Sequence, residues 1–109
     1  LKQARTDLLL KQNHPDQAET LLNTLLKSRP HDPDIWYQVA EVRGMVGNTI
    51  GLHEARAEYF ALVGDYDQAI EQLDFAKRRA SSNFPLASRI DARQRALIEE
   101  KKTVDQMMR

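Results

Sequence analysis

Turn signals recur every 17 residues along this chain, and that spacing constrains the fold more than any other feature. The signals fall at Asn13, Pro30, Gly47, Gly64 and Ser81. Between them, apolar residues recur at intervals of three and four, which is typical of amphipathic helices. Strand signals are missing, because there is no alternating β-branched run and no Asn-Gly or Asp-Gly dipeptide. The pattern therefore predicts an all-α fold.

We expect about six helices in a single domain covering residues 1–109. The segments between the turn signals place them at about 1–12, 16–28, 34–46, 50–63, 66–80 and 84–107. Asn83 is the expected N-cap of the last helix, and Pro85 fits its first turn, where a missing N–H costs little. Because this helix is long and its outward face is polar, we interpret it as a terminal cap. Phe84 is expected to pack in the core rather than to protrude.

Composition narrows the classes of partner. The chain has 109 residues, a length that favours one domain, and 16 basic residues balance 16 acidic ones. With no net charge, nothing attracts nucleic acid or an anionic membrane over long range. No apolar run approaches the length of a transmembrane helix. The chain has no cysteine, which excludes disulfides and thiolate metal sites, and its first residue is Leu, which suggests a fragment of a longer protein.

Helical hairpins of fixed pitch bury their apolar faces by stacking on neighbours, which favours a solenoid. Two steps of 17 residues make 34, the period of the tetratricopeptide repeat. The stretch from Gly64 to Ile70 resembles the turn and second-helix start of that repeat. The stretch from Asp34 to Ala40, with Trp36 at the aromatic position, resembles its first helix. The resemblance implies an antiparallel helix-hairpin solenoid. Leu52 departs from the pattern, which has Ala there. Ala18 and Ala69 lie 51 residues apart, one and a half periods, so helix 50–63 must both end one repeat and open the next.

A narrower resemblance covers most of the chain. Residues 13–26, 36–48 and 52–80, with a tail at 83–91, resemble the C-terminal repeat domain of BepA-like periplasmic proteins of Gram-negative bacteria. These proteins pair an N-terminal zinc metalloprotease with a tetratricopeptide domain and act in outer-membrane β-barrel assembly. The resemblance implies a periplasmic location, with β-barrel proteins and the β-barrel assembly machinery as partners. It leaves open an autoregulatory or structural arm of the metalloprotease, or an adaptor with another partner.

No catalytic motif stands out. His53 and Glu54 begin the zinc-protease pattern His-Glu-x-x-His, but Ala57 replaces the second histidine. His14 and His31 lie at turns, where solvent-exposed histidines are the ordinary interpretation. We therefore expect no catalytic residue, no metal ligand and no cofactor in this chain. The resemblance places zinc only in the protease domain of the parent.

A candidate groove follows from the repeat resemblance. Positions that face the concave surface in that family hold Tyr37, Glu41 and Gly44 here, with Met45 next. We also expect Glu54 and Glu58 in this groove. Residues 31–65 hold six acidic and two basic residues, a net charge of −4. An aromatic ring, an acid and a methionine suit an extended or helical peptide. The resemblance also indicates that the carboxylate clamp of some family members is absent, since Tyr37 and Glu41 replace its residues.

Basic residues gather in the C-terminal part of the chain. Residues 66–109 hold nine basic and seven acidic residues, and the basic ones cluster at 77–79 and at 89, 93 and 95. Arg89 and Arg93 are four residues apart and share a helix face. They could form a docking stripe for an anion, or a solvated face balanced by nearby acids. Because no aromatic residues are interleaved with them, nucleic-acid binding is not expected.

Overall fold

The computed structural model describes residues 14–108 and contains five α-helices within that range. They are α2 (Pro15–Ser28), α3 (Pro33–Met45), α4 (Thr49–Leu62), α5 (Tyr66–Arg79) and α6 (Phe84–Met107). Every bound agrees to within one residue with the expected helices between 16 and 107. The helix expected at about 1–12 lies outside the described residues. The all-α class is confirmed, and the described part holds the five helices expected there.

Short polar residues begin the helices. The side chain of Asn48 accepts a hydrogen bond from the N–H of Gly51 at 2.9 Å, and Asp65 accepts one from Gln68 at 3.2 Å. Asn83 caps α6 in the same way, as the sequence predicts. Each cap satisfies an N–H that has no partner inside the helix. Gly47 and Gly64 precede two of these starts with φ of 79° and 86°, a conformation that glycine adopts without strain.

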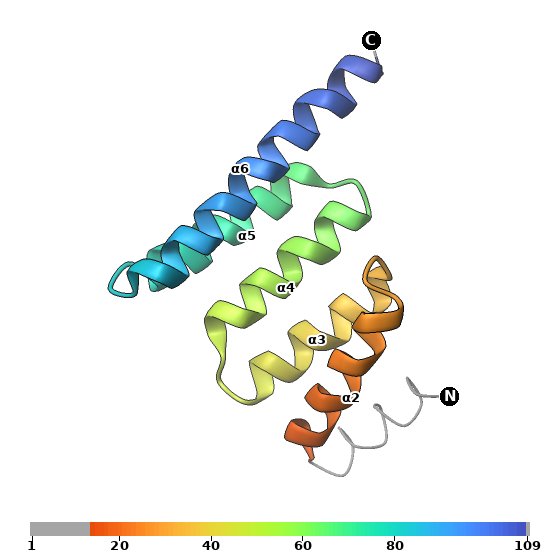
Figure 1. Cartoon of the computed structure of the whole chain (residues 1–109), viewed down its shortest axis with the longest axis vertical. Helices are drawn as coiled ribbons and strands as arrows, with labels where there is room; N and C mark the ends of the chain where they lie inside the picture. The colour runs from red at the N-terminus through yellow and green to blue at the C-terminus, as the bar shows by residue number, and fades with distance from the viewer. Residues whose placement is uncertain (1–13, 109) are drawn as a thin grey trace.

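The helices form a sequential antiparallel array (Figure 1). Each packs mainly against the helix before it and the helix after it. This arrangement is consistent with stacked helical hairpins. At 24 residues α6 is the longest helix, and Figure 1 shows its C-terminal end extending beyond the others. None of the described helices is both long enough and apolar enough to span a lipid bilayer.

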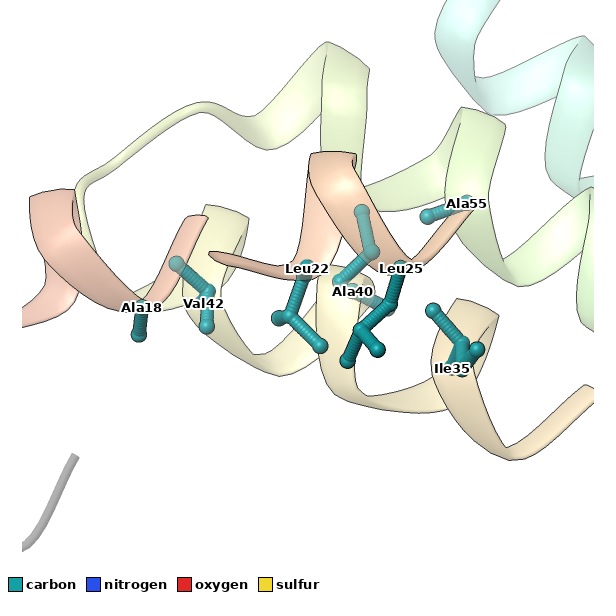
Figure 2. Close-up of a cluster of buried hydrophobic side chains, with 8 residues drawn as sticks. Ala18, Leu22, Leu25, Ile35, Ala40, Val42 and Ala55 are labelled. Atoms are coloured by element: carbon teal, nitrogen blue, oxygen red, sulfur yellow. The ribbon is translucent and has the colours of Figure 1, made fainter. Parts of the chain in front are cut away.

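Two apolar clusters stabilise the array, and α4 contributes to both. The first cluster joins α2, α3 and α4, and Figure 2 shows Leu22, Leu25 and Ile35 pointing toward one another within it. The second joins α4, α5 and α6 and includes the buried side chains of Leu73, Ile90 and Leu97. On α4, Ala55 belongs to the first cluster and Ala57 to the second, and both are fully buried. Because these side chains are small, neighbouring helices can pack closely on both sides of α4.

A buried polar network lies between α5 and α6. Gln94 is only 5% exposed and donates to Asp74 Oδ1 at 2.7 Å and to the carbonyl oxygen of Ile70 at 3.1 Å. Its own oxygen accepts from Lys77 Nζ at 2.6 Å. Since buried polar groups must find partners, this network favours one register of α6 against α5.

The expectation for Phe84 was wrong. Its side chain is 80% exposed at the first position of α6. The Asn83 cap fixes where the helix starts, and Leu86 then packs against the second cluster. A residue two positions earlier points in a different direction on a helix, so Phe84 faces solvent.

Candidate protein-docking site

Helix α4 has two unlike polar faces, and the predicted site residues divide between them. Arg56 lies two residues from both Glu54 and Glu58. Residues two apart on a helix do not share a face, so Arg56 points to one side and the two glutamates to the other. We call these the free side and the α6 side of α4.

An aromatic pocket opens on the free side. It has a volume of about 130 Å³ and is lined by Tyr37, Ala40, Glu41, Leu52, Arg56, Tyr59 and Phe60. The ring of Tyr37 meets that of Tyr59 edge to face at 5.6 Å, and Tyr59 meets Phe60 in the same manner at 5.5 Å. Edge-to-face contacts of this kind are favourable and fix the rings relative to one another. To the predicted pair of Tyr37 and Glu41, the fold adds the rings and the charge that α4 contributes.

The pocket combines an apolar lining with charged side chains of both signs. The side chain of Tyr37 is 55% exposed. Glu41 and Arg56 are also exposed, and neither forms an ion pair with another residue in the range 14–108. An apolar side chain of a ligand could fill such a pocket while polar groups beside it meet Glu41 and Arg56.

Gly44 lies close to this pocket without lining it, and Met45 is not among the lining residues. A Cβ atom added at Gly44 would stand 3.8 Å from Cδ1 of Leu52, a lining residue. Met45 ends α3 and is 54% exposed. Of the predicted groove residues, the structure therefore joins Tyr37 and Glu41 in the pocket and places Gly44 beside it.

Glu54 and Glu58 lie on the α6 side of α4, where they form ion pairs with Arg89 and Arg93. Nη2 of Arg89 donates to both carboxylate oxygens of Glu54, at 3.1 and 3.0 Å. Nε and Nη2 of Arg93 each donate to one oxygen of Glu58 at 2.8 Å. Both contacts are charge-assisted, and that of Arg93 is bidentate, whereas Arg89 shares one nitrogen between the two oxygens. The hydrogen bond with Glu58 raises the pKa of Arg93, so its guanidinium stays charged. The two glutamates are therefore separated from Tyr37 and Glu41.

Five pocket residues were not singled out by the sequence as site residues, and the smallest of them is Ala40. Leu52, Tyr59 and Phe60 belong to the apolar face of α4 and were expected in the core. Arg56 is the residue that could have indicated the pocket from the sequence, because it is a charged residue on the apolar face of α4. A charge there indicates that the face is open to solvent at that point.

Metal chemistry finds no support in the described part of the chain. No group of three or more His, Asp or Glu side chains between residues 14 and 108 is arranged to hold a metal ion. His53 lies between α4 and α5, with Nδ1 2.8 Å from Oε1 of Gln72. A comparison of the sequence with models of known protein families finds no match. The function of the candidate site therefore has to be inferred from its geometry.

Proposed function

We propose that the chain is a protein-interaction scaffold that binds a polypeptide on the free side of α4. The aromatic pocket with its exposed Tyr37 is the observation that carries the proposal. The pocket rings stand on ordered helices and lose little conformational entropy when a ligand binds. Aromatic side chains also contribute most of the binding free energy at many protein interfaces.

The proposed partners are unfolded outer-membrane β-barrel proteins and the β-barrel assembly machinery. The resemblance to BepA-like periplasmic proteins supports them, and with them a periplasmic location. Sequential helix packing supports the finer assignment of a tetratricopeptide solenoid. Strands of membrane barrels alternate apolar and polar residues. An extended strand segment could place one apolar side chain in the pocket and its polar neighbours beside Glu41 and Arg56.

Capture of an unfolded β-barrel protein by the immobilised domain tests the proposal. Tyr37→Ala combined with Glu41→Lys should weaken capture strongly, because it removes a ring and inverts a charge at the pocket. The matched control is Phe84→Ala with Glu99→Lys, which changes an exposed ring and an exposed acid on α6. The control should capture as well as the unaltered chain. Equal capture by all three proteins would contradict the proposal.

An autoregulatory or structural arm is the second candidate. The ion pairs of Arg89 and Arg93 favour it, because α6 occupies the two glutamates of α4 within the same chain. If α6 blocks a partner, Arg89→Ala with Arg93→Ala should increase capture. The scaffold proposal expects capture to stay unchanged.

We also propose that this chain catalyses no reaction by itself and that zinc chemistry belongs to the parent metalloprotease. The test is cleavage of casein by the purified chain, with and without added zinc. Zinc-dependent cleavage would contradict this part of the proposal.

A further inference from the structure

The structure accounts for most of the clustered basic residues. Lys77 and Arg95 both pair with Asp91, at 3.2 and 2.8 Å. Arg89 and Arg93 pair with the glutamates of α4. Arg78 and Arg79 are exposed and form no ion pair with any residue from 14 to 108. Unsatisfied cationic character is therefore concentrated at the end of α5.

Arg78 and Arg79 border a hollow between α4 and α5. We call it the basic hollow; it is lined by His53, Phe75, Arg78 and Arg79 and has a volume of about 430 Å³. None of its lining residues is acidic. Such a hollow attracts an anion, because no carboxylate of its own competes for the guanidinium groups.

Contacts with Phe75 and Gln72 hold the hollow in shape. The guanidinium carbon of Arg78 lies 5.1 Å from the centre of the Phe75 ring, a cation–π contact. The His53 ring lies 5.4 Å from the same ring. Nδ1 of His53 lies 2.8 Å from Oε1 of Gln72, and this contact holds the imidazole ring in place. The side chains of Arg78 and His53 are thus held in position before any ligand binds.

The basic hollow adjoins the aromatic pocket. His53 lies three residues before Arg56 on α4, and residues at that spacing are neighbours on a helix face. Arg56 lines the aromatic pocket and His53 lines the hollow. Both sites therefore open on the free side of α4, where one extended segment can contact them in turn.

We propose that the basic hollow binds the carboxylate side chains of an acidic stretch in the partner polypeptide. Arginine guanidinium groups match carboxylates with paired N–H donors, and Arg78 and Arg79 supply such donors here. The acidic stretch would lie next to the residue that fills the aromatic pocket. This inference rests on the proposed function, because it assigns a second contact to the same polypeptide.

Binding of a capped tetraglutamate peptide, followed by NMR on the whole chain, tests the inference. Capping leaves side-chain carboxylates as the only anions, and about 0.15 M salt screens charges beyond about 8 Å. Amide signals around His53 and residues 75–79 should shift, and capped tetraglutamine should not shift them. Arg78→Ala with Arg79→Ala should weaken binding about tenfold or more, since it removes two charge-assisted donors.

The matched control is Arg29→Ala with Arg95→Ala, which removes the same charge from exposed positions elsewhere. It should keep tetraglutamate binding, and circular dichroism should show both double variants folded. An equal loss in the two variants would overturn the inference, as would shifts remote from the hollow. Shifts caused by inorganic phosphate or by phosphatidylglycerol vesicles, but not by tetraglutamate, would overturn it too.

Failure of this inference can be told apart from failure of the proposed function. If tetraglutamate leaves the hollow unshifted while the Tyr37/Glu41 variant loses capture of an unfolded β-barrel protein, only the acidic contact is wrong. If tetraglutamate binds the hollow while the Tyr37/Glu41 variant captures normally, the aromatic pocket is wrong as the docking point.

Discussion

Both sides of α4 present charged side chains, but only on one side are these charges paired within the described part of the chain. On the α6 side, Glu54 and Glu58 are bound by arginines 35 residues further along the chain. On the free side, Glu41 and Arg56 stand near three aromatic rings without forming an ion pair with a described residue. A charged helix face therefore indicates a docking surface only when no other helix of the same chain forms ion pairs with its charged side chains.

The largest effect is expected where α6 is held in place. Leu97 is fully buried in the second cluster, and Leu97→Ala should lower the free energy of unfolding by about 2–5 kcal/mol because it leaves a cavity. Ile98→Ala, at the next and more exposed position, should cost much less. Urea denaturation measures both. Equal losses in the free energy of unfolding would mean that the burial of Leu97 does not hold α6 in place.

The buried network beneath α6 should matter next. Gln94→Ala should cost about 1–3 kcal/mol, because it leaves Asp74 and the Ile70 carbonyl without a donor. Gln106→Ala, an exposed change on the same helix, is the control. If the two variants unfold at the same urea concentration, the network does not stabilise the α6 side.

Double-mutant cycles compare the two sides directly. Glu58 and Arg93 should show a coupling of about 0.5–1 kcal/mol that shrinks as salt is added, because both side chains are partly exposed. The same cycle on Glu41 and Arg56 should give a coupling near zero. Coupling of equal size in both cycles would remove the distinction between the two sides.

The smallest expected effect concerns pH. A hydrogen bond from Lys101 to Asp67 raises the pKa of Lys101 above its ordinary value of 10.5. A raised pKa in the folded state stabilises the fold while the lysine is charged, and this contribution disappears as pH rises through the raised value. Lys101→Met should therefore have a slightly lower melting temperature than the unaltered chain near pH 8. Above the raised pKa, where Lys101 is neutral in both the folded and the unfolded state, the two proteins should melt at the same temperature. A gap that widens with pH would contradict the assignment.

The sequence could predict the helices because their ends are chemically marked. Asn83 before Pro85, and the glycines at 47 and 64, define starts and stops through capping and positive φ, which are local properties. Exposure of Tyr37 also followed from its place beside Trp36. Local rules could not place Phe84, whose side chain faces solvent although it is a large aromatic residue.

The candidate site was harder to predict because it depends on distant parts of the chain. Helical spacing shows that Glu54 and Glu58 share a face, but not that Arg89 and Arg93 lie across from it. The same limit applies to the basic hollow, which joins His53 to Arg78 and Arg79 across two helices. Only the packing of α4 against α5 and α6 decides which charges remain available to a partner.

Site-specific photocrosslinking tests the central claim most directly. A photoreactive phenylalanine analogue is placed at Tyr37, on the free side, or at Glu58, on the α6 side, and each protein is mixed with an unfolded outer-membrane β-barrel protein. We expect crosslinks from position 37 and few or none from position 58. Crosslinks from position 58 without any from position 37 would contradict it.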